Sequence, residues 1–257
     1  MLLVTVALLA AFTAGPPPQI TLATELQKHG VVSTGVDDAD REITSYTVAS
    51  DAVWFAIAYY WASETDSLPR VLRVRTLDRK NNVWRSALLD RETLGGGSAL
   101  RIARRAGVIY LDLHINPSAG RLVVLGEDLT VLERLYGWSS LILEDGRVLY
   151  ENSMVHFAPA HPGSVSLYDP RTRQDVRVYP PTPDSKTVAG LIDRSIGTIE
   201  MAGAQQVRIG VSERDVVLGP DNRGIAVGGV RDAMVTCNIS KLPPSCAIQP
   251  KQKGRQD

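Results

Sequence analysis

From position 43 onward, the hydrophobic residues follow the two-residue period of β-strands. The segment 108–115 reads VIYLDLHI, in which every second residue is an apolar aliphatic one. The segment 53–61, VWFAIAYYW, is apolar almost throughout, which is typical of a strand covered on both faces. Short turns rich in Asp, Asn and Gly separate these segments. The pattern predicts an all-β fold.

One segment before this region has the spacing of a helix. Between 20 and 29, Leu22 and Leu26 lie four residues apart on one face, and Thr21 is placed to cap the start. Gly30 follows at the position of a left-handed C-cap. We therefore expect a short helix within an N-terminal segment that spans 16–42.

Three segments repeat the same order of turns and strands. Each begins with a turn residue, a small residue and a strand: 51–56 (DAVWFA), 106–111 (AGVIYL) and 145–150 (DGRVLY). A later strand in each segment ends at an acidic turn residue, which is Asp78, Asp128 or Asp169. With four short strands per unit of about 40–55 residues, the repeat predicts the blades of a β-propeller. Such blades must stack, because a single blade cannot bury both of its faces.

The last part of the chain adds further strand-like segments. The expected short strands are 196–201, 206–211, 215–218, 225–230 and 233–238. Counted as one blade and part of another, they predict a propeller-like array of about five four-stranded blades over 43–250. A β-sandwich is the alternative architecture, because strands of these lengths also form sandwiches.

The third copy of the repeat carries a resemblance to a known family. Val165-Ser-Leu-Tyr-Asp-Pro-Arg-Thr, followed by Val178-Tyr-Pro, resembles the repeats of secreted β-propeller proteins over 164–180. It is most similar to the streptogramin-lyase type, with its strand, Asp-Pro-x-Thr turn and Tyr-Pro exit. The resemblance implies a propeller fold. It implies no catalytic residue, because the His and Glu constellation of that lyase has no placeable counterpart here.

The N-terminal residues have the character of a secretory signal. Residues 1–14 read MLLVTVALLAAFTA, carry no charge, and are too few to cross a bilayer. Three prolines follow at 16–18. We predict a signal peptide over 1–15, cleaved after Ala14 or Gly15, with a buried N-terminal strand or helix as the alternative. No other segment is long and apolar enough to span a membrane, so we expect a secreted or periplasmic protein.

The two cysteines agree with export. Cys237 and Cys246 are separated by eight residues that include Pro243 and Pro244, which favour a turn. In an oxidising compartment we expect a disulfide between them, before a C-terminal tail at 251–257. The alternative is two free thiols. Arg outnumbers Lys 22 to 6, which is typical of a bacterial genome rich in GC.

The overall charge excludes some classes of partner. With 28 basic and 28 acidic residues, the chain has a formal net charge of zero. It lacks the positive charge that dominates nucleic-acid binding and attraction to anionic membranes. The sequence does not identify a partner, and a protein or a small-molecule ligand is compatible with it.

The histidines offer only weak catalytic candidates. His114 shares a strand face with Asp112, and His156 and His161 lie in one loop-rich stretch. These four residues suit acid–base chemistry if the fold brings them together, and otherwise they are ordinary polar residues. No active-site motif is present, and we expect no cofactor and no metal.

Other charged groups have both a functional and a structural interpretation. Asp37, Asp38 and Asp40 lack the glycine and glutamate of a calcium loop, so we expect a solvated acidic turn. Two arginine clusters suit a carboxylate or phosphate ligand, or else pair with nearby acidic residues. They are Arg101, Arg104 and Arg105, and Arg171, Arg173 and Arg177.

These features favour an exported, non-catalytic, propeller-like protein that binds a ligand or acts as a scaffold. The alternative is a secreted propeller enzyme, a lyase or hydrolase acting on a small molecule or glycan. A third hypothesis is a fragment that completes its ring with another chain, which predicts an exposed, unpaired edge strand.

Overall fold

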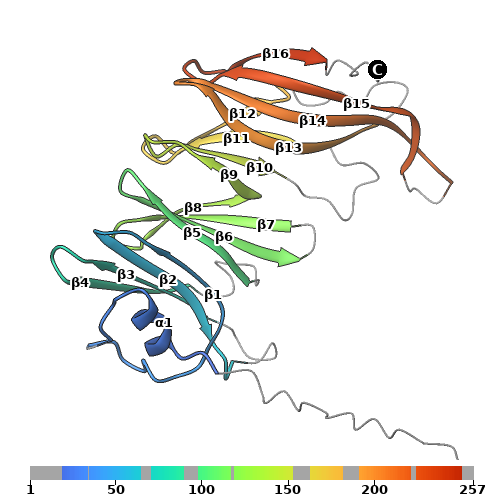
Figure 1. Cartoon of the computed structure of the whole chain (residues 1–257). Coiled ribbons are helices and arrows are strands. Elements are labelled where there is room, and N and C mark those ends of the chain that lie inside the picture. The colour runs from blue at the N-terminus through green and yellow to red at the C-terminus, as the bar shows by residue number, and fades with distance from the viewer. Residues whose placement is uncertain are drawn as a thin grey trace, which may run out of the picture. The chain divides into compact units, whose positions relative to one another are not determined.

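Four antiparallel sheets make up most of the structure, which is a computed structural model (Figure 1). It describes residues 19–33, 35–64, 71–89, 98–116, 119–152, 163–181, 191–220 and 224–250. Each sheet contains four strands that are consecutive in the chain and neighbours in space. The expected all-β, propeller-like fold is confirmed, because such four-stranded units are the blades of a propeller.

The first two sheets cover the first two copies of the repeat. Sheet 1 contains β1 (Ile43–Ser50), β2 (Trp54–Trp61), β3 (Leu72–Asp78) and β4 (Val83–Leu89). Sheet 2 contains β5 (Ser98–Arg105), β6 (Val108–Asn116), β7 (Ala119–Gly126) and β8 (Val131–Tyr136).

The other two sheets follow in the same way. Sheet 3 contains β9 (Trp138–Ile142), β10 (Val148–Asn152), β11 (Ser164–Asp169) and β12 (Gln174–Tyr179). Sheet 4 contains β13 (Leu191–Gly203), β14 (Gln206–Leu218), β15 (Gly224–Asn238) and β16 (Ser245–Pro250).

The repeated acidic residues have the same role in three sheets. Each stands at the turn between the third and fourth strand, where its carboxylate accepts a hydrogen bond from the backbone N–H two residues later. The pairs are Asp78 and Lys80 (3.0 Å), Asp128 and Thr130 (3.1 Å), and Asp169 and Arg171 (2.9 Å). This is the local turn that Asp favours, and it explains why the sequence repeat marks the end of a strand.

Neighbouring sheets bury their facing side chains against each other. On β6, Ile109 and Leu111 join a buried cluster with residues of sheet 1. Tyr110, between them in sequence, joins a second cluster with Val148 and Tyr150 of sheet 3. The predicted alternation is therefore confirmed, and both faces of sheet 2 are covered. A third cluster joins sheets 3 and 4.

Two glycines allow close packing at the start of β9, one within sheet 3 and one between sheets 2 and 3. Gly137 has φ +140°, and a Cβ atom there would lie 1.9 Å from the carbonyl oxygen of Glu151. A Cβ atom on Gly120 of β7 would lie 2.2 Å from the Trp138 ring. Both positions therefore exclude a side chain. Gly137 therefore allows β9 to pair closely with β10, and Gly120 allows the first strand of sheet 3 to approach sheet 2.

Sheet 4 corrects the predicted number of blades. The segments expected as separate strands at 206–211 and 215–218 form the single strand β14, and those at 225–230 and 233–238 form β15. The polar residues near 213 occupy an irregularity in the β14–β15 register, between Glu213 and Asp215, and do not form a turn. A bulge accepts an extra residue without ending the strand. The described part of the chain therefore contains four sheets, where about five blades were expected.

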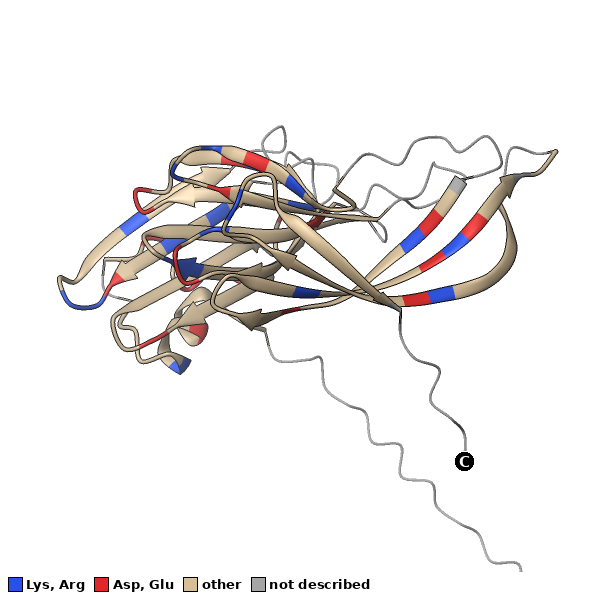
Figure 2. Cartoon of the chain, turned by 90° about the horizontal axis from the view of Figure 1, so that it is seen from above, with Lys and Arg blue, Asp and Glu red and all other residues tan. Residues whose placement is uncertain are grey.

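Charged side chains pair across the long strands of sheet 4, where blue and red segments stand beside each other (Figure 2). Opposite charges at facing positions stabilise antiparallel strands. The ion pairs are Asp193 with Arg214 (2.5 Å), Arg194 with Glu213 (2.5 Å), and Asp215 with Arg231 (2.7 Å). They join β13 to β14 and β14 to β15.

One end of β15 forms an exposed edge. β16 pairs with β15 only from Ala233 onward, and residues 224–232 are all exposed. Within the described residues, no strand covers this stretch on the side away from β14. It is the kind of edge that the third hypothesis requires. Pairing with a second chain stays a prediction.

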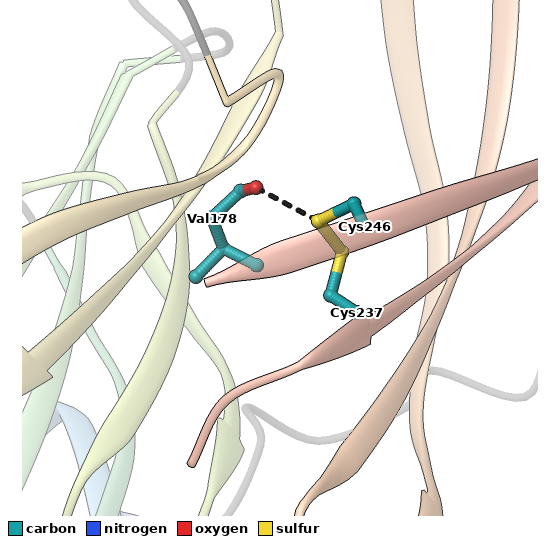
Figure 3. The surroundings of a disulfide bond; sticks show 3 residues. All are labelled: Val178, Cys237 and Cys246. Atoms are coloured by element: carbon teal, nitrogen blue, oxygen red, sulfur yellow. Dashed lines mark hydrogen bonds between the residues drawn. A yellow bond between two sulfur atoms is a disulfide. The ribbon is translucent and has the colours of Figure 1, made fainter. Parts of the chain in front are cut away.

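The predicted disulfide is confirmed. Cys237 and Cys246 face each other in the β15–β16 ladder and are joined by their sulfur atoms (Figure 3). The Sγ atom of Cys246 lies 3.1 Å from the carbonyl oxygen of Val178 in β12. Cys237 and Val178 belong to the same buried cluster. The disulfide therefore lies where sheet 4 packs on sheet 3.

The chain divides into two compact units, and the smaller one contains the helix. It extends to Thr44 and includes Trp61–Ser63, whereas the larger unit contains the rest of the sheets. The helix α1 (Leu22–Lys28) begins at Thr21, whose side chain accepts a hydrogen bond from the Thr24 N–H (3.2 Å). Gly30 has φ +65°. The predicted helix and both of its caps are confirmed.

Several predicted features lie outside the described residues. These are the signal peptide over 1–15, most of the loop that contains His156 and His161, and the tail at 251–257. Within the described ranges, no helix is both long enough and apolar enough to cross a membrane.

Candidate functional site

The first strands of sheets 1, 2 and 3 enclose a groove of about 320 Å³. We call β1, β5, β9 and β13 the leading strands, because each begins its sheet, and we call this cavity the leading-strand groove. Its lining residues are Ala49, Ser50, Asp51, Trp54, Arg101, Ile102, Ala103, Arg104, Arg105, Ser140, Leu141 and Ile142. The predicted cluster of Arg101, Arg104 and Arg105 therefore lies in a cavity.

Because successive side chains of a strand lie on opposite faces, the arginines of β5 occupy both faces of the sheet. Ile102 belongs to the cluster shared with sheet 1, and the guanidinium of Arg104 lies 5.7 Å from the ring centre of Trp54 in that sheet. Arg101 and Arg105 occupy the opposite face, which is turned toward sheet 3. One strand thus supplies cations to both sides of the groove.

Two charged residues of the groove, Arg104 and Asp51, have partners. Arg104 forms an ion pair with Glu127. The carboxylate of Asp51 accepts hydrogen bonds from the N–H groups of Val53 and Trp54, both at 2.8 Å.

Two cations of the groove remain available to a ligand. Arg101 and Arg105 are exposed, and neither has a hydrogen-bond or ion-pair partner within the described ranges. The groove therefore offers two guanidinium groups to solvent.

Asp112, a candidate catalytic residue, is held by sheet 3. Its side chain is 4% exposed and accepts hydrogen bonds from the N–H (2.8 Å) and the hydroxyl of Ser139 in β9. Burial raises the pKa of the Asp112 carboxyl, and the hydrogen bonds from Ser139 and the charge of Arg101 oppose that rise. Both carboxylate oxygens are occupied, so the residue connects sheet 2 to sheet 3.

No contact within the described ranges brings the other catalytic candidates, which are His114, His156 and His161, to Asp112. His114 lies two residues further along β6, on the same face, and is half-buried. His156 and His161 lie outside the described residues. The convergence that the enzyme hypothesis requires therefore stays a prediction.

The remaining charged candidates lie on the surface. Asp37, Asp38 and Asp40 are exposed, and Asp38 pairs with Arg41 at 3.6 Å. Within the described ranges, no group of three or more His, Cys, Asp or Glu residues is placed to hold a metal ion.

The second arginine cluster is also exposed, at the β11–β12 turn. Arg171 pairs there with Asp169 at 2.9 Å, and Arg173 and Arg177 are exposed to solvent. None of these three arginines is among the lining residues of the leading-strand groove.

A second cavity continues along the leading strands and was not predicted from the sequence. It has a volume of about 450 Å³ and contains Leu141 and Ile142, which also line the leading-strand groove. Met201 and Gly203 of β13 form its far side. Met201 and Gly203 belong to no motif in the sequence, and only the packing of sheet 4 beside sheet 3 brings them to the cavity.

Arg194 forms a buried network that sequence reasoning also missed. The residue is 3% exposed, and its guanidinium contacts the carboxylate of Glu213 (2.5 Å) and the carbonyl oxygen of Gly163 (3.2 Å). It also lies 5.3 Å from the ring centre of Tyr179, whose hydroxyl donates to Glu213 (3.3 Å). Because the buried charge is paired and hydrogen-bonded, its role is to join sheets 3 and 4.

Comparisons with known proteins do not assign this chain to a family. No known protein family matches this sequence, and no curated protein is significantly similar to it. Among solved structures, the chain is similar to the β-propeller domain of the trilobed protease from Pyrococcus furiosus, which is described as having an open velcro topology. The two are 10% identical, with a TM-score of 0.39 over 82% of this chain and 69% of that one.

At this identity and TM-score the similarity is too low to assign a fold. The fold assignment therefore rests on the four four-stranded sheets themselves. The sequence resemblance to streptogramin-lyase repeats stays a prediction. The segment that carries it forms the β11–β12 hairpin.

Proposed function

We propose that this chain is an exported, non-catalytic binding protein whose ligand occupies the leading-strand groove. The observation that carries the proposal is the groove itself, to which three consecutive sheets each contribute their first strand. Its volume of about 320 Å³ is within the range of small-molecule sites.

The groove is lined by groups that suit binding better than chemistry. The guanidinium groups of Arg101 and Arg105 present several N–H donors and no acceptor, which suits the binding of a ligand. The hydroxyls of Ser50 and Ser140 add donors and acceptors, and Trp54 provides an apolar wall. Asp51, the carboxylate among the lining residues, accepts hydrogen bonds from two backbone N–H groups at its turn, so we assign it a structural role and not that of a general base.

Two observations support export. The N-terminal segment 1–15 has the length and apolar character of a secretory signal. The pair Cys237–Cys246 forms a disulfide, a bond that persists mainly in oxidising compartments.

Ligand-detected NMR tests the binding function. The purified protein is mixed with a defined library of small carboxylates, phosphates and neutral sugars, and bound compounds are identified by saturation transfer. We expect at least one compound to bind. Its signal should vanish in Ser140→Trp, which fills the groove, and persist in Ser86→Trp, which adds the same ring to an exposed position on β4.

A library without a single binder would contradict the proposal. So would a binder whose signal is the same in Ser140→Trp as in the wild type, because such a compound lies elsewhere on the protein. Circular dichroism of both variants confirms that they are folded.

A further inference from the structure

We infer that the leading-strand groove binds a ligand that carries carboxylate or phosphate groups, held by Arg101 and Arg105. The inference rests on the proposed function and names the chemistry of its ligand.

The two arginines share one face of one strand. They lie four residues apart on β5, so their Cα atoms are separated by roughly 13 Å along an extended strand, and both side chains line the same groove. Arg101 stands opposite Asp112 in the β5–β6 ladder, and Asp112 contacts Ser139 of sheet 3. This register places the face that carries both arginines toward β9, beside Ser140.

The carboxylates near the two arginines make hydrogen bonds or ion pairs with other groups. Both carboxylate oxygens of Asp112 accept hydrogen bonds from Ser139, and Glu127 pairs with Arg104. Asp51 accepts two backbone N–H groups at its turn. Within the described ranges, no hydrogen bond or ion pair engages the guanidinium groups of Arg101 and Arg105, and the charge of Asp112 acts on Arg101 from the opposite position in the ladder.

The chemistry of the guanidinium group selects the ligand class. Its planar array of N–H donors matches the two oxygens of a carboxylate or phosphate, and such charge-assisted hydrogen bonds are stronger than neutral ones. The apolar walls formed by Leu141 and Ile142 reduce competition from water and strengthen the interaction. An anionic group can accept hydrogen bonds from both guanidinium groups at once, which a neutral ligand does less strongly.

Calorimetric titration of the full chain with inorganic phosphate, citrate and glucose tests this inference. Phosphate and citrate represent the two anionic groups, and glucose is the neutral control. We expect at least one anion to bind, with an affinity that falls as the salt concentration rises, and we expect no binding of glucose. In Arg101→Gln/Arg105→Gln the affinity should fall by at least about tenfold.

The control removes two exposed arginines away from the groove. Arg177→Gln/Arg208→Gln makes the same change in net charge, on β12 and β14, and should bind the anion as the wild type does. The single variants Arg101→Gln and Arg105→Gln separate the two contributions if the double variant fails to fold.

The outcomes separate this inference from the proposed function. If a neutral compound of the library binds in the groove and neither anion does, the anionic ligand is wrong and the binding function stands. An anion that binds equally to the wild type and to Arg101→Gln/Arg105→Gln also overturns the inference. If nothing in the library binds, both proposals fail.

Discussion

Asp112 illustrates at the scale of one residue how a polar side chain becomes part of the core. It is buried between two sheets, where an unpaired carboxylate would be costly. Ser139 supplies two hydrogen bonds from the neighbouring sheet, one from its backbone and one from its hydroxyl. The same contact compensates the burial of Asp112 and joins sheet 2 to sheet 3.

Removing the carboxyl group should destabilise the fold. Asp112→Ala leaves the N–H and hydroxyl of Ser139 unpaired, and we expect the free energy of unfolding near neutral pH to fall by about 1–3 kcal/mol. Asp112→Asn should lower the free energy of unfolding by less. The amide group of the asparagine can still accept a hydrogen bond from the Ser139 N–H and donate one to the Ser139 hydroxyl. Urea denaturation measures both variants, and equal losses would contradict the hydrogen-bonded role.

The sign of the pH dependence follows from the direction of the pKa shift. Burial raises the pKa of Asp112 in the folded state above its unfolded value. The stability from this group is therefore fully present below the unfolded pKa and is lost as the pH rises through the folded pKa. The unfolding free energy of the wild type, minus that of Asp112→Asn, should decrease as the pH rises from about 4 to about 7. An increase over this range would mean that the pKa is lowered instead.

At the scale of elements, the turns explain why the repeat was readable in the sequence. Asp78, Asp128 and Asp169 each accept a hydrogen bond from the backbone two residues later. Side-chain hydrogen bonds from Asn81, Thr130 and Arg171, respectively, are the largest cause that holds the pKa of these carboxyls below the usual value. Such interactions are local, so the residue type alone predicts them.

Sheet 4 shows where local reasoning fails. Glu213 and its neighbours are polar enough to predict a break between two short strands, and yet β14 continues through them. Arg194 and Arg231 lie opposite Glu213 in the two adjoining ladders, which places all three residues inside the sheet. The partners are about 20 residues away in sequence on either side, as expected for neighbouring long strands. Their pairing is not visible in a local pattern.

The disulfide between β15 and β16 should contribute to stability. In Cys237→Ser/Cys246→Ser, the unfolded chain loses the constraint of a short closed loop, and we expect the free energy of unfolding to fall by about 2–3 kcal/mol. Ser245→Ala changes an exposed neighbour on β16 and serves as the control. Denaturant unfolding under non-reducing conditions compares the three proteins. A double variant as stable as the wild type would contradict a stabilising role of the bond.

At the scale of the whole molecule, the candidate site depends on how the sheets stack. The cluster of Arg101, Arg104 and Arg105 was visible in the sequence because its members are close neighbours on one strand. Ser50 and Ser140, which face the same groove, lie far from it in the chain and have no motif. The order of strands could be predicted, but the cavity arises only when β1, β5 and β9 meet.

Hydrogen–deuterium exchange tests whether this protein binds its ligand in the leading-strand groove. Exchange is measured with and without the strongest binder of the small-molecule library, in the wild type and in Ser140→Trp. We expect slower exchange in 98–105 and 138–142 of the wild type, and no such change in Ser140→Trp. Protection confined to β14–β16 of sheet 4, or the same protection in both proteins, would contradict it.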